Sequence, residues 1–414
     1  MRVLWFTNNP VNLSAELLSG GWMQALERTF AADPEIELHI ATRAREGGRA
    51  NRREVGGTTY HLLQDKRSLL RKRLDIAVDH EPHKDFLEQY LELIGEIAPD
   101  VIHIFGTEMD YGLICEKTTI PVIIHVQGVL NSIYFQLQKI NISKFKQIKA
   151  QRFIDYIRGG SYGNNLKTLK RRSGNESKIL KKCNHVIGRT AWDKRMMTIL
   201  APNARYFHCE EMLRKEFFEH TWCMPRAPLA NIVSVISSPV YKGHDNIIEA
   251  CKVMTEAGIA FRWHVIGLEK NTFAFNFFYK AHIASMKDAL CFHGPLPSQA
   301  LIEVLLSASV YVHPSHIENS SNAICEAMAL GMPVVALDVG GNASMVRDGE
   351  DGLLLPDHDP YSLAAAIKRL ATDSVLAQRL GAAAKVRAHA RHDPHRIVVE
   401  LKKIYSELVS SHAS

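Results

Sequence analysis

Three short stretches of this 414-residue chain carry the glycines and small polar residues that suit a phosphate site, because each precedes a helix-like sequence. These stretches are Gly20-Gly21, Asn319-Ser320-Ser321 and Gly340-Gly341. The free N–H groups and the dipole of a helix N-terminus attract anions, and glycine lets the backbone approach a ligand closely. Lys242, which follows a predicted strand, can add positive charge, and the alternative is a solvated loop lysine. These residues are candidates for holding a phosphate, although each position alone is also ordinary turn chemistry.

The common nucleotide fingerprints are absent from the sequence. No G-x-G-x-x-G follows a predicted strand, and no G-x-x-x-x-G-K-[ST] phosphate loop occurs. Any phosphate must therefore be held by helix N-termini and a few cations.

Glu318 and Glu326 stand on either side of the second of these helix starts. Glu326 is predicted in the first or second turn of the helix, and Glu318 in the loop before it, so both can face one ligand. Carboxylates accept hydrogen bonds from vicinal hydroxyls. The alternative is an exposed helix residue and an incidental loop charge.

Apolar runs rich in Val and Ile alternate with helix-length amphipathic segments along the whole chain. Continuous apolar runs without alternation suit strands buried on both faces, as in parallel sheets covered by helices. The two successive sets predict an α/β protein of two doubly wound domains, 1–225 and 226–394, with the junction near Pro225 to Pro228. Ligands of such sheets bind beyond the carboxyl ends of the strands. The runs are 2–7, 36–42, 58–63, 101–105, 121–126, 185–188, 232–237, 261–267, 289–294, 309–314, 333–338 and 352–356.

Residues 313–356 resemble the family-4 glycosyltransferases, retaining enzymes of the GT-B fold that use nucleotide-sugar donors. The likeness rests on Pro314-Ser315, Glu318, Glu326, Ala327-Met328, Gly331-Met332-Pro333-Val334-Val335 and Gly340-Gly341. It extends more weakly over 99–108, 188–195, 241–250 and 263–267, and over the last helix, 395–414. The resemblance implies two Rossmann-like domains facing a central cleft, with that last helix packing back on the first domain.

The resemblance also implies roles for residues of this chain. Glu326 would hold the donor ribose, Glu318 the donor sugar hydroxyls and Lys242 the diphosphate. The amides of Asn319, Ser320, Ser321 and Asn322 would contact sugar or phosphate, and the backbone of His293 to Leu296, including Gly294, would contact the base. Gly21 joins the donor set and lies near the acceptor hydroxyl with Glu108 and Gln127. No cofactor is implied beyond the nucleotide-sugar substrate.

Two residues of the family pattern are missing from this chain, and other groups must take their roles. Ser237-Ser238 stands where the family has a Gly-Arg pair, so either the hydroxyls and backbone at Ser237 suffice to bind the donor or another cation replaces the Arg. We consider Arg189 as that cation, with a structural ion pair as the equal alternative. Gln127 stands where the family often has a catalytic His, and Gln can position a hydroxyl but cannot accept a proton. Glu108 or the donor's leaving phosphate would then serve as base. His125, on the same predicted strand, is expected to be a buried, hydrogen-bonded residue rather than a catalytic one.

Residues 136–182 hold 13 Lys and Arg and only Asp155 and Glu176, a net charge of +11, whereas the whole chain carries +6. In a helix, Tyr134, Leu137, Ile140, Phe145 and Ile148 would share one side. This pattern is typical of a basic amphipathic helix on an anionic membrane surface. The equal alternative is a helix whose apolar side packs on the first domain. No nucleic-acid motif accompanies the charge, so we expect no nucleic-acid partner.

Several patterns are predicted to be structural. Asp357-His358-Asp359 reads as a helix cap, and His313 and His316 lack the further ligands of a metal site, so no metal is expected. Seven scattered cysteines without a C-x-x-C pair, and no predicted signal peptide or spanning helix, favour a cytoplasmic protein.

The sequence therefore predicts a retaining glycosyltransferase, peripheral at the inner face of the cell membrane if the basic segment docks there. Its acceptor would be a glycan or a lipid-linked sugar in cell-surface polysaccharide or glycolipid biosynthesis. The alternatives are another GT-B enzyme, such as a nucleotide-sugar 2-epimerase or a phosphorylase, and a non-catalytic sugar- or membrane-binding protein of the same fold.

Overall fold

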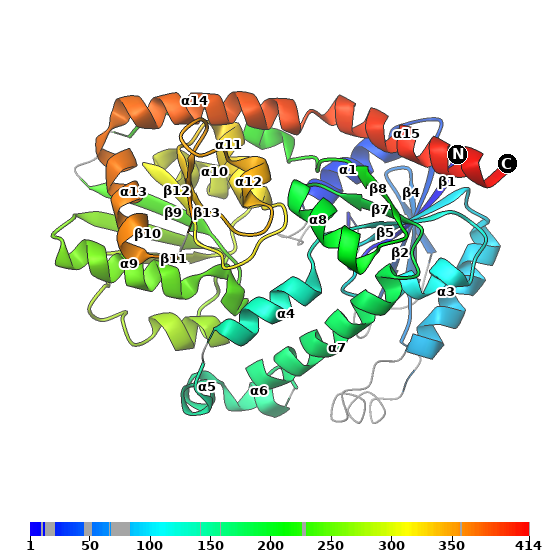
Figure 1. The fold of residues 1–414 in the computed structure, drawn as a ribbon, viewed down its shortest axis with the longest axis horizontal. Coiled ribbons are helices and arrows are strands. Elements are labelled where there is room, and N and C mark those ends of the chain that lie inside the picture. The colour runs from blue at the N-terminus through cyan, green and yellow to red at the C-terminus, as the bar shows by residue number, and fades with distance from the viewer. Residues whose placement is uncertain are drawn as a thin grey trace. The chain divides into compact units, whose positions relative to one another are not determined.

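The computed structural model describes residues 1–9, 11–12, 21–44, 52–65, 67, 83–140, 142–157, 159–225, 229–356 and 358–413. The chain divides into two compact units (Figure 1). The N-terminal unit comprises Met1–Tyr134, Gly163–Met212 and Asp393–Ser414, and the C-terminal unit comprises Phe135–Tyr162 and Leu213–His392. No helix in the described ranges is both long enough and apolar enough to span a membrane.

The N-terminal unit is built on an eight-stranded sheet of order β3-β4-β2-β1-β5-β6-β7-β8. All neighbouring strands are parallel except the β3–β4 pair. The strands are β1 Arg2–Phe6, β2 Glu37–Arg43, β3 Arg52–Val55, β4 Thr58–Leu63, β5 Val101–Phe105, β6 Val122–His125, β7 His185–Gly188 and β8 Arg205–His208. The helices are α1 Gly21–Ala31, α3 His83–Ile97, η1 Tyr111–Glu116, α4 Leu130–Lys139, α7 Tyr162–Leu180, α8 Ala191–Leu200 and α15 Pro394–Ala413.

Helix α15 supplies part of the core of the N-terminal unit. Its Ile397, Leu401, Ile404 and Leu408 are buried with residues of β1, β2 and α1. Tyr405 is fully buried, and its hydroxyl accepts a hydrogen bond from Trp5 Nε1 at 3.1 Å and lies 2.5 Å from His103 Nδ1. The last helix therefore packs on the N-terminal sheet through both apolar and polar contacts.

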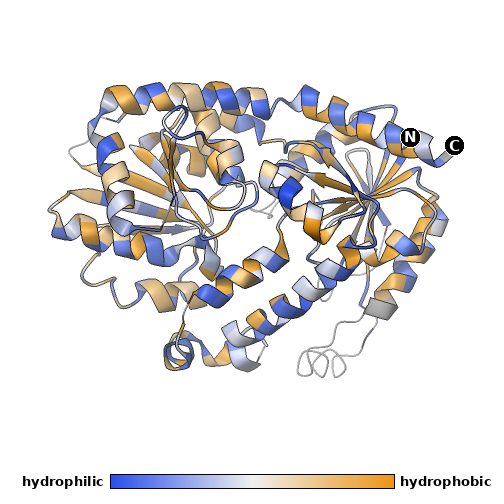
Figure 2. Cartoon of the chain, viewed as in Figure 1, coloured by the Kyte–Doolittle hydropathy of each residue, from blue (hydrophilic) through white to orange (hydrophobic). Residues whose placement is uncertain are grey.

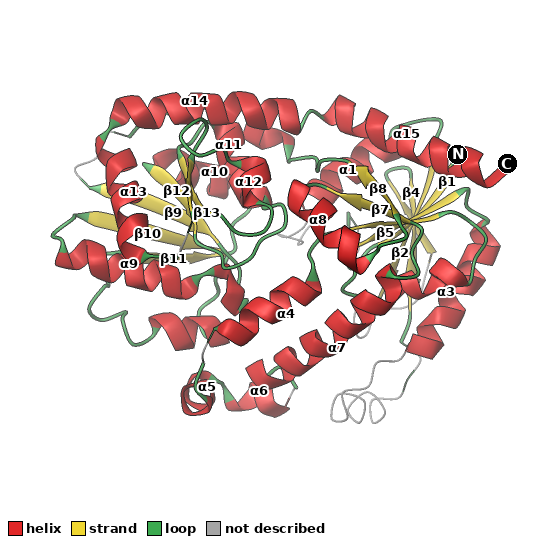
Figure 3. Ribbon diagram, viewed as in Figure 1, coloured by secondary structure: helices red, strands yellow, loops and turns green. Residues whose placement is uncertain are grey.

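The C-terminal unit contains a six-stranded parallel sheet of order β11-β10-β9-β12-β13-β14, the doubly wound order of dinucleotide-binding folds. The strands are β9 Ala230–Val235, β10 Phe261–Ile266, β11 Leu290–Gly294, β12 Val310–His313, β13 Val334–Leu337 and β14 Leu353–Leu355 (Figure 3). The helices are α5 Lys144–Ala150, α6 Phe153–Ile157, η2 Lys215–Phe218, η3 Val240–Lys242, α9 His244–Glu256, η4 Phe275–Tyr279, α10 Ser298–Ser307, α11 Asn322–Leu330, α12 Asn342–Met345, α13 Pro360–Thr372 and α14 Ser374–Arg391.

Both faces of this second sheet are buried. On β12, Val310 and Val312 pack with α9 and α13, while Tyr311 between them packs with α10, α11 and α14. Successive side chains of a strand point to opposite faces, so burial of both faces requires a continuous apolar run. Figure 2 shows these strands as hydrophobic. Each of the twelve predicted runs overlaps a strand, and β3 and β8 were not predicted.

The division between the units differs in two places from the predicted boundary at 225/226. It falls after Met212, because Leu213, Phe217 and Trp222 belong to the core of the C-terminal unit. Trp222 Nε1 donates to the carbonyl of Ala308 at 2.7 Å. Residues 226–228, part of the predicted junction, lie outside the described residues.

The second difference is the basic segment, which is not one helix. Its residues form the end of α4, then α5, α6 and α7, and 135–162 group with the C-terminal unit while the rest group with the N-terminal unit. Helix α7 packs in the N-terminal unit through Glu176, Ile179 and Leu180. The predicted packing alternative therefore describes α7 but not α5 and α6.

Candidate functional site

Glu318 lies in the loop between β12 and α11, where two basic side chains contact its carboxylate. Lys242 Nζ lies 2.8 Å from Oε2 and donates to Oε1 at 3.1 Å. His313 Nε2 lies 3.0 Å from Oε2. Lys242 comes from the β9–α9 connection, so three chain segments meet at this carboxylate.

These contacts determine the charge state of the pair. Burial raises the pKa of Glu318, but the Lys242 charge and the His313 hydrogen bond outweigh it and hold the pKa far below its usual range. Burial lowers the pKa of Lys242, and the Glu318 charge more than restores it, so that it lies above its usual value. Glu318 is therefore a carboxylate that accepts hydrogen bonds and is a weak base.

His313 is oriented by a second contact. Its Nδ1 lies 3.2 Å from the hydroxyl of buried Tyr311. A carboxylate only accepts, so Nε2 carries the proton toward Glu318 and, in the neutral ring, Nδ1 accepts from Tyr311. The strand β12 thus fixes the ring that in turn fixes Glu318.

Two glycines hold the loop of Glu318 in place. Gly243 has φ +79°, and a Cβ there would lie 1.9 Å from the carbonyl oxygen of Pro314. Gly340 has φ +56°, and its Cβ would lie 1.8 Å from the carbonyl oxygen of Glu318. The next residue, Gly341, donates its N–H to that same oxygen at 3.0 Å. Only residues without a side chain fit these two positions.

The N-terminus of α11 adjoins this loop. Ser321 is the N-cap residue but makes no side-chain capping hydrogen bond. Asn319, Ser320 and Ser321 are buried, and Oδ1 of Asn322 is buried without a hydrogen-bond partner. The helix N-terminus therefore keeps N–H groups for an anion.

Glu326, in the second turn of α11, is paired with Arg214. Arg214 Nε donates to Oε1 at 2.9 Å and Nη2 lies 2.8 Å from the same oxygen, while Nη1 donates to Ser298 Oγ at 2.9 Å. Burial raises the pKa of Glu326, and the Arg214 charge opposes this only in part. Both nitrogens use Oε1, so Oε2 can accept from a ligand.

Glu108 and Gln127 lie together in the N-terminal unit, around Gly106. A Cβ on Gly106, which has φ +91°, would lie 1.9 Å from Glu108 Oε2 and 3.2 Å from Gln127 Cγ. Asn8 Nδ2 donates to that carboxylate oxygen at 2.9 Å, and Gln127 Nε2 is buried without a hydrogen-bond partner. Burial raises the pKa of Glu108. These residues follow β1, β5 and β6, at the carboxyl ends of neighbouring strands.

Arg189 forms the structural ion pair that the sequence left open. Its Nε lies 3.8 Å from Glu211 Oε2, its Nη2 donates to the Gln127 carbonyl at 3.0 Å, and its guanidinium lies 5.3 Å from the Trp22 ring centre. All four residues belong to the N-terminal unit. The role of Arg189 toward a donor stays a prediction.

His125 is buried, as predicted, but it is not hydrogen-bonded. Neither ring nitrogen has a hydrogen-bond partner among the described residues, and the ring stacks on His103 at 5.4 Å between centroids. Burial lowers its pKa well below the usual value, so the ring is neutral. Its surroundings are those of a core residue.

The remaining predicted residues are placed at strand or helix ends. Ser237 is exposed after β9, and its carbonyl accepts from His244 Nε2 at 3.2 Å. Gly294 ends β11 with φ +66°, and Gly21 begins α1. Gly20 lies outside the described residues.

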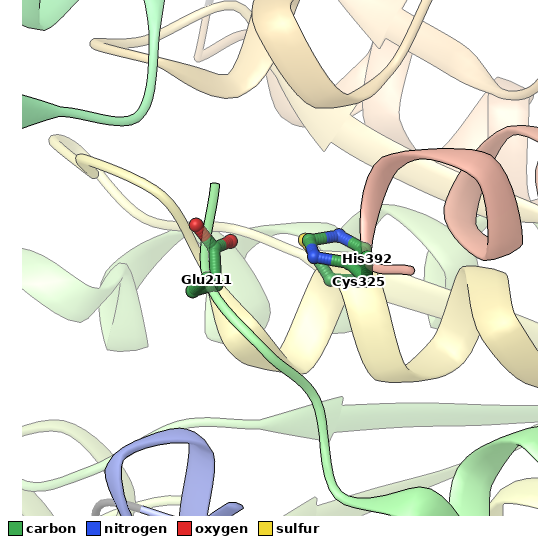
Figure 4. Close-up of side chains that lie close together, drawn as sticks. All are labelled: Glu211, Cys325 and His392. Carbon is green, nitrogen blue, oxygen red and sulfur yellow. The ribbon is translucent and has the colours of Figure 1, made fainter. Parts of the chain in front are cut away.

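The sequence patterns that were predicted to be structural are Asp357-His358-Asp359 and the pair His313 and His316. Asp359 accepts from the N–H groups of Tyr361 and Ser362 and so caps α13, whereas Asp357 lies outside the described residues. His316 Nε2 lies 2.8 Å from Asp245, away from the Glu318 contacts of His313. Figure 4 labels Cys325 and His392 of the C-terminal unit and Glu211 of the N-terminal unit. The ligand atoms of Cys325 and His392 lie within 4.8 Å of one another. Among the described residues, the C-terminal unit thus contributes two ligands to this group, whereas a structural zinc site takes four.

The sequence did not point to Arg214, Tyr311 or Asn8. Arg214 lies 112 residues from Glu326 in the chain, in a segment assigned to the other domain. Tyr311 reads as an ordinary core residue of a strand, and Asn8 as turn chemistry. No local signal distinguishes them, because each acts through a contact made only in the fold.

Comparison with known proteins gives a family for much of the C-terminal unit. Residues 230–387 match the family model of the glycosyl transferases group 1. The D-inositol 3-phosphate glycosyltransferase of Acidothermus cellulolyticus is 47% identical over 83 residues, which are 20% of this chain and 18% of that protein. The protein of the same name from Thermomonospora curvata is 36% identical over 166 residues, 36% of each chain. The chain thus spans about a third or less of the length of these relatives.

Solved structures match over almost the whole chain. Sucrose-phosphate synthase from Thermosynechococcus elongatus has a TM-score of 0.75 at 17% identity and covers 99% of both chains. HepE from Anabaena, in complex with UDP and glucose, has a TM-score of 0.65 at 12% identity and covers 98% of this chain and 99% of its own. The predicted α/β fold class, GT-B with two doubly wound sheets, is confirmed.

Proposed function

We propose, on the premise that residues 230–387 form a group 1 glycosyltransferase domain, that this chain is a retaining glycosyltransferase. It would transfer a sugar from a nucleotide-diphosphate sugar to an acceptor hydroxyl and require no other cofactor. The observation that carries this proposal is the ionised Glu318, held by Lys242 and His313 beside the uncapped N-terminus of α11. Such a site offers cations and N–H groups to a diphosphate and a carboxylate to sugar hydroxyls.

The donor would lie along the carboxyl ends of the C-terminal strands. Lys242 and the amides of Asn319, Ser320, Ser321 and Asn322 bind the diphosphate and sugar, and Glu318 accepts from the sugar hydroxyls. Oε2 of Glu326 accepts from the ribose hydroxyls, with Arg214 as a positioning residue. Ser237 and Gly294 border the same edge of the sheet.

Glu318 is a poor choice of base, because the contacts that ionise it also weaken its affinity for a proton. A retaining transfer in which the leaving phosphate takes the acceptor proton needs no protein base. Glu108, whose pKa is raised by burial, is the proposed alternative, and Gln127 would position the acceptor. Gly21 and Arg189 complete the set of residues proposed to bind the donor.

The proposed acceptor is a glycan or a lipid-linked sugar of a surface polysaccharide or glycolipid, and the proposed site of action is the cytoplasmic face of the cell membrane. This proposal draws on the +11 charge of residues 136–182. UDP-glucose is the first donor to test, because HepE, which shares the fold, is in complex with UDP and glucose.

The test is a panel of nucleotide sugars, scored by thermal shift and by turnover with and without acceptor. Glu326→Gln removes the proposed ribose carboxylate, and exposed Glu256→Gln on α9 is the matched control. We expect Glu326→Gln to weaken donor binding roughly tenfold or more, as for the loss of a charged hydrogen bond. Unchanged binding would refute the donor site. Isomerisation of the donor without acceptor would identify an epimerase. Transfer of the sugar to phosphate would identify a phosphorylase, and donor binding without turnover would identify a non-catalytic protein.

A further inference from the structure

Helices α5 and α6 expose an unusual share of the large hydrophobic side chains. Of the thirteen that are exposed in the described part of the chain, five lie within residues 145–156. Phe145 is 78% exposed, Phe153 79% and Ile148 64%. The other two are Ile154 and Tyr156. Single exposed apolar residues are normal, but a cluster of this kind marks an interaction surface.

The exposed side of α5 has a defined pattern. At 100° per residue, Ile148 and Phe145 are neighbours on the helix surface, and Lys144 and Lys149 lie on either side of them. All four are exposed, whereas Ala150 on the opposite side is buried. An apolar strip bordered by lysines can enter a lipid headgroup region while the ammonium groups stay at its surface.

The charge around the strip is predominantly positive. Residues 135–157 carry five Lys and Arg and one acidic residue, Asp155. Asp155 accepts hydrogen bonds from Arg152 Nη2 at 2.7 Å and from Gln151 Nε2 at 3.0 Å, so its charge is already compensated. The complement of this surface is an extended array of negative charge over an apolar layer.

The two helices are fixed to the C-terminal unit at their other side. Asn276 Nδ2 donates to the carbonyl of Ala150 at 3.1 Å, and the rings of Tyr162 and Phe273 stack at 4.7 Å. Gln151 Oε1 also accepts from the N–H of Tyr162 at 2.9 Å and closes the segment. The exposed residues are thus presented from an anchored base.

We propose that α5 and α6 form a membrane-docking surface, in which Phe145, Ile148 and Phe153 insert into an anionic bilayer and Lys144, Lys146 and Lys149 bind its headgroups. A surface that bound by charge alone would not need exposed aromatic rings, and core packing would not leave them exposed. This inference goes beyond the proposed reaction, because none of these residues belongs to the donor or acceptor site.

The first test is co-sedimentation of the full chain with phosphatidylcholine vesicles, with and without phosphatidylglycerol. We expect binding only with the anionic lipid. Phe145→Ser/Phe153→Ser should lower the partition coefficient on the order of a hundredfold, about tenfold for each ring. Lys144→Gln/Lys146→Gln/Lys149→Gln should lower it by a similar factor, about fivefold for each lysine. Val375→Ser/Val386→Ser, equally exposed on α14, is the matched control and should bind as the parent chain does.

The second test reports insertion directly. Trp5, Trp22, Trp192, Trp222 and Trp263 are all buried, so a Phe145→Trp variant adds the one tryptophan at this surface. Its emission should shift to the blue on anionic vesicles and be quenched by brominated acyl chains. Binding unaffected by the Phe variants, absence of quenching, or binding to nucleic acid in place of vesicles would overturn the proposal. Donor turnover with a soluble acceptor should persist in the Phe variants, which separates failure of this surface from failure of the proposed reaction.

Discussion

The carboxylate of Glu326 depends on a single cation, Arg214, and on burial that works against its charge. Because burial raises the pKa of Glu326 and Arg214 opposes that rise, removing Arg214 favours the protonated acid, a poorer acceptor for ribose hydroxyls. Arg214→Gln should therefore weaken donor affinity roughly tenfold or more and make the affinity fall further as the pH is lowered. Titration calorimetry of the donor at a series of pH values measures both effects.

The matched control is Ser298→Ala, which removes the other hydrogen bond of Arg214 and leaves its pair with Glu326. That variant should lose little affinity and show no new pH dependence. If Arg214→Gln binds the donor as the parent does at every pH, Arg214 has no positioning role.

Substitution of His125 tests whether the buried histidines of the N-terminal sheet have a structural role. Burial lowers the pKa of His125 well below 6.5 and that of His103 to about 3, so the unfolded chain binds protons that the folded chain does not. Stability is then full above about pH 6.5 and is lost below it, by about 1.4 kcal/mol per pH unit for each ring. His125→Phe should raise the Tm at about pH 5 more than at about pH 7.5 and leave turnover intact. His103→Phe, which breaks the contact with Tyr405, should lose stability at neutral pH as well.

At the scale of elements, the loop of Glu318 is shaped by glycines of two neighbouring loops. Gly340→Ala would put a Cβ against the carbonyl oxygen of Glu318, so the loop must move and the contacts of Lys242 and His313 with the carboxylate must change. We expect a lower Tm and at least tenfold weaker donor binding. Gly258→Ala is the control, because it shares a positive φ, +66°, but its Cβ would meet nothing within 4 Å. Equal losses in both variants would mean that backbone strain alone is responsible.

The strands that could be predicted from the sequence differ in burial from the two that could not. Twelve strands were visible because two-sided burial demands continuous apolar runs such as Val310–His313. The strands β3 and β8 lie at the two edges of the N-terminal sheet, and all four residues of β3 are exposed, which permits the sequence Arg-Arg-Glu-Val. The spacing of residues within one motif predicted the site residues Glu318, Glu326 and Lys242. Arg214 was not predicted, because its partner Glu326 is distant in sequence. The sequence of the basic segment showed its charge, but it did not show that the segment divides between two units.

At the scale of the molecule, two units with separate cores should unfold as two transitions, since each buries its own apolar surface. Lys242, Arg214, Glu318 and Glu326 all belong to the C-terminal unit. A nucleotide sugar should therefore stabilise that unit, by about 2.7 kcal/mol at roughly a hundred times its Kd. Differential scanning calorimetry of the full chain should show one transition rising with donor concentration.

Two variants show which unfolding transition belongs to which unit. Tyr405→Phe removes the hydroxyl that accepts from Trp5, so it should lower the N-terminal transition by about 1 kcal/mol and leave donor binding unchanged. Ile247→Val, on the buried side of α9, should lower the C-terminal transition by a similar amount. The donor should raise the transition that Ile247→Val lowers. If it raises the one that responds to Tyr405→Phe, the donor binds the N-terminal unit, and if both variants lower one shared transition, the two units unfold together.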